Sequence, residues 1–218
     1  MIDRAARMRC LLIGDIIGKP GRLAVVGGLP AMRAELDLDL VIANGENLAA
    51  GAGLTPSLSE ELLANGVDVI TSGNHIWDKR EIYDYLDSGR PVLRPLNYPD
   101  DAPGRGWLLH TLADGDRVAV VNVMGRVFMN QLDSPFAAMD GLLDGAAEPL
   151  PAAASAAAAT APSSRDRVRV ILLMSLASFG EGLVLEPRIG CIDRRRLGRR
   201  FAPWRPPGLS DRTAEHGL

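Results

Sequence analysis

Three stretches decide the fold: LLIGD (residues 11–15), LVIANGEN (residues 40–47) and VDVITSGNH (residues 67–75). Each begins as a short, largely apolar run without polar alternation, which is typical of parallel strands buried on both faces. Asp15 and Glu46 are 31 residues apart, and Glu46 and Asn74 are 28 apart. That spacing is about one strand-helix-strand repeat. The pattern predicts three successive strands of one parallel sheet in an α/β fold.

Polar side chains follow each of these strands. Because ligands bind at the carboxyl ends of strands in open α/β sheets, we expect Asp15, Glu46, Asn74 and His75 to meet at one edge. Carboxylate, amide and imidazole donors suit Mn, Mg, Fe or Zn. Two such ions about 3.5–4 Å apart can clamp both oxygens of a phosphoryl displacement. In this interpretation Asp15 and Asn74 are terminal ligands, Glu46 is a bridge, and His75 donates a proton or stabilises charge.

Each of these residues also has an ordinary structural interpretation. An Asp after a strand often caps a turn or a helix, and a single His can be a satisfied core residue. Their joint position at three strand ends, in order, favours a metal site.

The other elements follow from local signals. After a turn-rich connection over residues 16–22, a helix is expected over 23–36, although Gly27, Gly28 and Pro30 weaken it. Thr55-Pro56 starts a second helix that ends near Asn65. Asp78 and Glu81 form a capping-box pattern before a short helix that ends at Leu86. The period changes at Pro91, and the later strands are expected over the ranges 92–93, 107–109 and 118–123, with a hairpin turn at Asp114-Gly115 between the last two.

Three motifs resemble the bacterial YmdB-like branch of the calcineurin-like metallophosphoesterases: LIGDIIGKPGR (12–22), NGEN (44–47) and GNHIWDK (73–79). LRPLNYP (93–99), PGRG (103–106) and NVMGRVFM (122–129) extend the resemblance over about residues 8–144. It implies a metallophosphoesterase-like βαβα sandwich, incomplete at the C-terminal end. It also implies one or two divalent ions of Mn, Fe, Mg or Zn. The implied site residues are Asp15, Glu46, Asn47 and Asn74 at the metal and His75 in the chemistry.

The same resemblance implies hydrolysis of 2′,3′-cyclic nucleotides by a metal-bound hydroxide, with a small phosphodiester or nucleotide as substrate. Family sites also take histidine ligands from two later segments, a His-Ala-Glu-like motif and a Gly-Thr-His-Thr-His-like motif. This sequence has neither, and His110 and His216 have no such context. An impaired enzyme is therefore expected. The alternative is a non-catalytic family remnant that binds a nucleotide, a phosphate or RNA.

Three arginines are the cations expected to meet substrate phosphate: Arg94, Arg105 and Arg126. A guanidinium fork matches the geometry of a phosphate group. The alternative for each of them is a surface ion pair, which implies little about function.

Composition divides the chain near Gly145. Residues 1–145 are expected to form the metallophosphoesterase-like domain, 146–164 an Ala- and Pro-rich linker, and 165–218 an atypical Arg- and Pro-rich tail with one predicted strand at 168–174. The tail has three interpretations: a solvated disordered segment, an RNA-binding arm, or the product of a reading frame shifted after Leu143. Sequencing the encoding DNA tests the last one. It is contradicted if no alternative frame encodes the two histidine segments.

The whole sequence sets further bounds. A chain of 218 residues that is 47% hydrophobic fits one globular domain. Its net charge of −3 argues against bulk electrostatic attraction to nucleic acid or membrane. Cys10 and Cys191 form no disulfide framework, which predicts a reducing, cytoplasmic setting. Neither a signal peptide nor a membrane-spanning run is expected. A dehydrogenase fingerprint and a serine-hydrolase elbow are both missing from the sequence.

Overall fold

The predicted strands form one parallel sheet in the computed structural model, which describes residues 8–127, 129, 132–145, 168–175 and 189–190. The sheet has the order β1 (Cys10–Asp15), β2 (Leu40–Asn44), β3 (Val69–Thr71) and β4 (Val92–Leu93). Every neighbouring pair is parallel. The prediction of a parallel sheet is confirmed. Residues 92–93, which the change of period grouped with the later strands, belong to this sheet instead.

β1 differs from the other strands in its burial. The β2 residues Leu40 to Ala43 are at most 1% exposed, whereas every residue of β1 is partly or fully exposed. Burial on both faces was therefore predicted correctly for β2 and β3 and wrongly for β1. The reason is strand order, because β1 lies at the edge and pairs only with β2 among the described strands.

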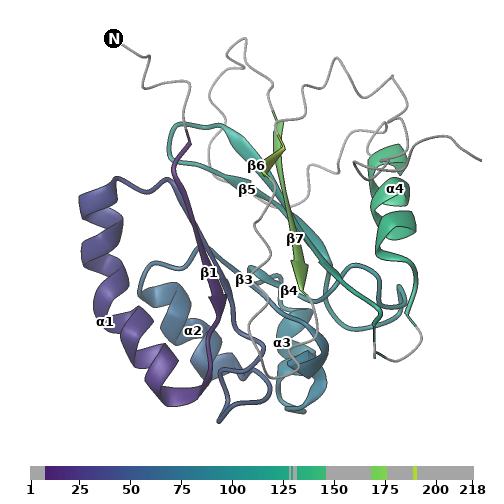
Figure 1. The fold of residues 1–218 in the computed structure, drawn as a ribbon, viewed down its shortest axis with the longest axis horizontal. Helices are drawn as coiled ribbons and strands as arrows, with labels where there is room; N and C mark the ends of the chain where they lie inside the picture. The colour runs from purple at the N-terminus through teal and green to yellow at the C-terminus, as the bar shows by residue number, and fades with distance from the viewer. Residues whose placement is uncertain (1–7, 128, 130–131, 146–167, 176–188, 191–218) are drawn as a thin grey trace, which may run out of the picture.

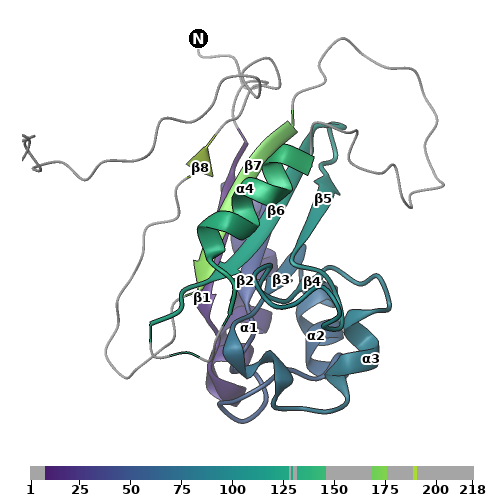
Figure 2. The same ribbon diagram turned by 90° about the vertical axis from the view of Figure 1, so that its right-hand side faces the viewer.

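Helices α1 (Gly18–Leu36), α2 (Pro56–Ala64) and α3 (Ile82–Leu86) cover one face of this sheet (Figures 1 and 2). α1 begins at Gly18, whose φ of +55° suits glycine, so most of the segment predicted as a loop is its first turn. The cap of α2 is as predicted, because the Thr55 hydroxyl accepts the N–H of Leu58 at 3.3 Å. The capping box at Asp78 is wrong. A 3₁₀ helix, η2 (Asn74–Trp77), comes first, and α3 has no side-chain cap at Glu81.

A second sheet faces the first. It has the order β5 (Trp107–Thr111), β6 (Arg117–Met124), β7 (Val168–Ser175) and β8 (Ile189–Gly190). β5 and β6 form the predicted hairpin, with Gly115 in its turn at φ +86°. β7 confirms the strand predicted near residue 168 and runs parallel to β6. Helix α4 (Pro135–Gly145) lies on the outer side of this sheet (Figures 1 and 2).

Two apolar clusters hold the layers together. The first lies between the helices and the parallel sheet and includes Leu29, Leu62, Ile70 and Ile82. The second lies between the sheets, with Leu40, Ile42, Val69 and Leu93 packed against Leu108, Val118, Val120 and Ile171. These clusters confirm the predicted sandwich.

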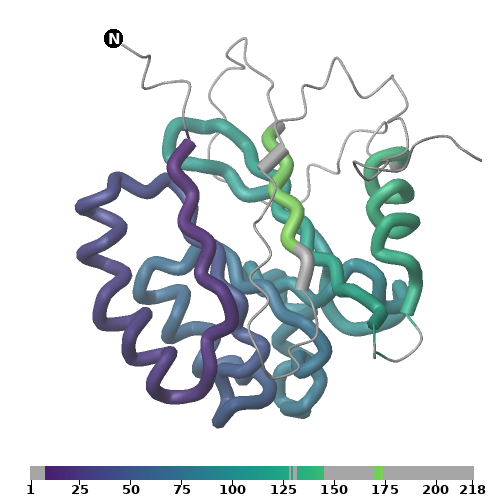
Figure 3. Tube along the Cα trace, in the orientation of Figure 1, coloured from purple at the N-terminus to yellow at the C-terminus, as the bar shows by residue number. Residues whose placement is uncertain are grey.

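The chain builds these layers in order. Figure 3 shows the N-terminal, purple to blue part of the trace forming the helical layer and the first sheet before the later part forms the second. No described helix is long and apolar enough to cross a membrane. The linker over 146–164 and most of the Arg-rich tail lie outside the described residues, so the two boundaries between the three segments remain predictions.

Candidate metal centre

The residues predicted as metal ligands meet at the carboxyl edge of the parallel sheet. Asp15 ends β1, Glu46 and Asn47 follow β2, and η2 after β3 carries Asn74 and His75. Asn47 Nδ2 donates to Asp15 Oδ2 at 2.7 Å, which joins the ends of β1 and β2. The backbone N–H of His75 donates to Glu46 Oε2 at 3.4 Å, which joins the ends of β2 and β3. The structure therefore brings these segments together as expected.

The Glu46 carboxylate is held in a tight backbone setting. Glu46 is only 3% exposed. Asn44 makes two hydrogen bonds with it: Asn44 Nδ2 donates to Oε1 at 3.1 Å, and Asn44 Oδ1 accepts the Glu46 N–H at 3.0 Å. Gly73 lies against the carboxylate, since a Cβ at that position would come within 2.3 Å of Oε2. Gly73 thus leaves room for Glu46, and Asn44 orients it.

Asp15 presents an oxygen that needs a partner. Its Oδ2 accepts the Asn47 amide, but its Oδ1 is buried and has no hydrogen-bond partner in the part of the chain that the structure describes. A buried carboxylate oxygen without a partner is destabilising, and a cation is one group that would satisfy it. The donor set of two carboxylates and two amides fits a hard divalent ion.

The protein side chains nevertheless do not make a full ligand set. Across the described ranges, no group of three or more His, Cys, Asp or Glu side chains could hold one ion. Asp15 and Glu46 would need the amide oxygens of Asn47 and Asn74, together with water, to complete a shell. The site thus fits an ion held by few charged ligands.

His75 is oriented by a carboxylate. Its Nδ1 lies 2.8 Å from Asp78 Oδ2, and both side chains are about 40% exposed. If Nδ1–H donates to Asp78, Nε2 is the ring nitrogen left for a ligand. The sequence predicts a helix cap at Asp78 instead. Residues three positions apart in a helical turn lie on the same face, so the spacing of His75 and Asp78 is a sequence signal for this contact.

Tyr98 is a further residue beside the site that was not among the candidates. Its ring packs edge to face on Trp77, with centroids 5.2 Å apart. Burial raises the pKa of Tyr98, an interaction with Trp77 opposes that shift, and the nearby carboxylates of Glu46 and Asp78 add to it. Tyr98 stands within the resembling segment 93–99, which was the available signal.

The three candidate phosphate-binding arginines all contact backbone carbonyls. Arg94 is 5% exposed and donates to Pro95 O at 3.0 Å and Pro99 O at 3.3 Å. Burial lowers its pKa and that of Arg105. Arg105 donates to the carbonyls of Gly89 and Arg90, which precede β4, and Arg126 to that of Leu132. Among described residues none of the three forms an ion pair, and only Arg94 directly follows a strand of the parallel sheet.

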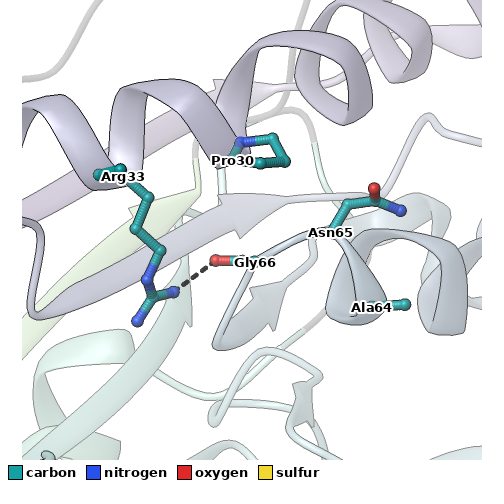
Figure 4. A pocket seen from close by; sticks show the side chains of 6 residues that line it. Pro30, Arg33, Ala64, Asn65 and Gly66 are labelled. Atoms are coloured by element: carbon teal, nitrogen blue, oxygen red, sulfur yellow. Dashed lines mark hydrogen bonds between the residues drawn. The ribbon is translucent and has the colours of Figure 1, made fainter.

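A shallow groove of about 410 Å³ lies elsewhere, near the amino end of β3 (Figure 4). Its lining residues are Pro30, Arg33, Ala34, Ala64, Asn65 and Gly66. Arg33 donates to Gly66 O at 2.6 Å and Asp68 Oδ2 at 2.8 Å, so its charge is already engaged. The groove is separate from the candidate metal centre, because Gly66 precedes β3 whereas Asn74 follows it.

Comparison with known proteins agrees with the family resemblance of the sequence motifs. The family model described as YmdB-like protein matches residues 11–163. A 2′,3′-cyclic-nucleotide 2′-phosphodiesterase of Bacillus subtilis is 42% identical over 144 residues, which cover 66% of this chain and 54% of that protein.

Two solved structures share the fold. A hypothetical protein from Thermus thermophilus has a TM-score of 0.61 at 41% identity, over 77% of this chain and 58% of that one. A novel phosphatase from Mycoplasma pneumoniae has a TM-score of 0.58 at 28% identity, over 63% and 51%. The fold is thus of the metallophosphoesterase type, as predicted, and the chain spans about half the length of the relatives it matches.

Proposed function

This chain belongs to the YmdB-like protein family, and from that premise we propose that it is a metal-dependent phosphodiesterase acting on 2′,3′-cyclic nucleotides. One observation carries the proposal. Asp15 and Glu46 lie at the ends of neighbouring strands, and one carboxylate oxygen, Asp15 Oδ1, is buried without a partner among described residues. The name of the Bacillus subtilis relative supports the substrate class.

Asp15, Glu46, Asn47 and Asn74 would hold the metal. When bound, a divalent ion supplies Lewis acidity toward the phosphate oxygens and activates water. The chain's own contribution is to fix the ligands. Asn44 and Gly73 set the position of Glu46, and Asn47 sets that of Asp15. Such supporting contacts raise the precision with which ligands are placed.

His75 is proposed as the general acid. Opening a cyclic phosphate releases a ribose oxygen, which needs a proton as the P–O bond breaks. Asp78 Oδ2 lies 2.8 Å from His75 Nδ1 and fixes the orientation of the ring, so Asp78 is a positioning residue. Among the arginines, Arg94 is the best placed for a phosphate contact, and such a contact would require its bonds to Pro95 and Pro99 to loosen.

The two absent histidine motifs lower the expected activity. With two carboxylates and no third charged ligand among the described residues, we propose weak metal binding and slow turnover. The same observation supports a second candidate function, a non-catalytic protein that binds a nucleotide or phosphate at this edge.

Hydrolysis of 2′,3′-cyclic AMP and of a generic phosphodiester with added Mn²⁺ tests the proposal. We expect slow turnover by the full chain that Asp15→Ala and Glu46→Ala both abolish. Asp133→Ala is the matched control, since Asp133 is an exposed acidic residue outside the site. A folded protein without turnover that still binds the nucleotide would support the second function instead. Turnover that survives both substitutions would contradict the proposed site.

A further inference from the structure

A fourth strand end reaches the edge that carries the candidate metal centre. β4 is parallel to β3 and lies beside it, so the segment after β4 runs next to η2, which follows β3. The ends of the two strands are in contact, since Ser72 Oγ donates to Leu93 O at 2.7 Å. The segment after β4 contains Tyr98, whose aromatic ring has no part in the proposed metal binding or proton transfer.

The Tyr98 ring lies beside the site residues. Its edge-to-face contact with Trp77, at 5.2 Å between centroids, places it against η2, which also carries His75. One such contact covers at most one face of a ring, and Tyr98 is only partly buried. Burial raises the pKa of Tyr98, and the carboxylates of Glu46 and Asp78 add to the shift. Its hydroxyl therefore lies within electrostatic range of a proposed metal ligand and of the partner of His75.

The turn that carries Tyr98 is held in place before any ligand binds. The neighbouring Asn97 is 1% exposed, and its Nδ2 donates to Met124 O at 2.9 Å and Asp133 O at 3.0 Å. Asn97 Oδ1 accepts the N–H of Met124 at 2.9 Å. The N–H of Tyr98 itself donates to Pro95 O at 3.4 Å. A group that is already positioned loses little conformational entropy when it contacts a ligand.

Core packing explains the other rings of this aromatic group but not Tyr98. Trp77 and Tyr83, whose centroids are 5.5 Å apart, both pack against the helix-side cluster. Tyr98 belongs to neither of the two apolar clusters that the described residues form. It is thus the ring at the margin of the group, on the side of the candidate site.

We propose that the Tyr98 ring stacks on the base of a nucleotide whose phosphate binds at the candidate metal centre. Tyr98 is then a specificity-determining residue, and this inference rests on the proposed function. The base of a nucleotide is one ribose away from its phosphate, and Tyr98 packs on Trp77, two positions beyond His75. Stacking on an aromatic side chain tolerates any base, because every base has a π-face. The chain should therefore prefer nucleotides to base-free phosphoesters.

Isothermal titration calorimetry of the full chain with Mn²⁺ tests the proposal with two ligands that differ only in the base, 3′-AMP and ribose 3-phosphate. We expect 3′-AMP to bind more tightly, and Tyr98→Leu to weaken its binding by about tenfold without changing that of ribose 3-phosphate. Tyr98→Phe keeps the ring and should bind 3′-AMP like the unmodified chain. Tyr85→Leu is the matched control, because Tyr85 is also partly buried but contacts Glu60 of α2 at 2.7 Å.

The proposal is overturned if Tyr98→Leu leaves the affinity for 3′-AMP intact, or weakens both ligands equally, because Tyr98 would then support the site as a whole. A loss in Tyr98→Phe as large as in Tyr98→Leu would assign the contact to the hydroxyl and overturn stacking. If the unmodified chain binds the two ligands equally, this inference fails while the proposed function is left intact. If it binds neither ligand, the proposed function fails together with the inference.

Discussion

Glu46 and Asp15 are held in different ways, and this difference sets what each can do. Both Glu46 oxygens accept hydrogen bonds, and Gly73 lies against them. Asp15 has one satisfied oxygen and one buried oxygen without a partner within the described residues. Glu46 is thus positioned before any ion binds, and Asp15 gains most from one.

Gly73→Ala tests the positioning of Glu46. A Cβ there would lie 2.3 Å from Oε2 and 2.7 Å from Oε1, so the carboxylate must move. Loss of such a supporting contact costs about 10–100-fold in metal affinity. We expect a loss of this size in Mn²⁺ binding measured by calorimetry. Gly14→Ala next to Asp15 is the control, because its Cβ meets nothing within 4 Å. Equal affinities for the two variants would show that Glu46 does not need this space.

His110 predicts a pH dependence of stability. Burial lowers its pKa below the usual value of about 6.5; Asp68 opposes this shift, and Arg33 adds to it. The neutral ring is thus favoured in the folded state, and the unfolded chain binds the proton more readily. His110 therefore contributes its full stability above about pH 6.5 and loses it progressively as the pH falls below that value through its lower folded-state pKa.

Chemical unfolding between pH 7.5 and 5 measures this effect. In His110→Gln, the free energy of unfolding should fall less steeply on acidification than in the unmodified chain. Identical slopes would mean that His110 titrates alike in both states. An NMR titration of the ring checks the pKa directly.

Among the elements, helix α1 shows packing overriding local propensity. Gly27, Gly28 and Pro30 predict a weak helix, yet α1 runs over all of Gly18–Leu36. Leu29 is 3% exposed and packs in the helix-side cluster with Val25 and Val26. Helices in proteins draw most of their stability from such an apolar face. The early start at Gly18 depends on a positive φ that the sequence reveals only as a glycine.

The two sheets are tied together near the candidate site by Asn122 of β6. This residue is 1% exposed, and its Nδ2 donates to Ser72 O at 2.7 Å and Leu93 O at 3.3 Å. Both acceptors belong to the segments that end β3 and β4. Asn122 thus helps to fix the carboxyl edge of the parallel sheet against the second sheet.

Asn122→Leu should lower the free energy of unfolding by about 1–3 kcal/mol, because a buried carbonyl of Ser72 loses its donor. Urea unfolding followed by circular dichroism measures the change. Asn65→Leu is the control, since Asn65 donates to Glu61 O at 2.8 Å at the C-terminal end of α2 and is only partly buried. A loss no larger in Asn122→Leu than in Asn65→Leu would contradict a linking role for Asn122.

For the molecule as a whole, the sequence predicts what depends on local order along the chain. The apolar runs and their spacing place Asp15, Glu46, Asn74 and His75 at one edge, because right-handed strand-helix-strand units leave little choice. The hairpin at Asp114-Gly115 follows from turn chemistry in the same way. The sequence also predicts that two sheets face each other, because continuous apolar runs indicate a parallel sheet and the hairpin strands that follow indicate a second sheet.

What the sequence does not predict depends on contacts between distant segments. The exposure of β1 follows from strand order, which no single run encodes. Asp78 fits both a cap and a histidine partner, and only the position of η2 decides between them. The fold of the Pro95–Pro99 loop directs the Arg94 side chain to backbone carbonyls. The sequence alone does not show whether an arginine is buried in this way or exposed at the surface.

Binding of Mn²⁺ to the full chain, measured by electron paramagnetic resonance, tests the proposed metal centre most directly. We expect saturable binding that Asp15→Asn and Glu46→Gln each weaken by tenfold or more, by about 1.4 kcal/mol or more in binding free energy. Asp133→Asn, an exposed acidic control, should leave it unchanged. Absence of saturable binding by the folded chain, or equal binding by Asp15→Asn, would contradict a metal site at this edge of the sheet.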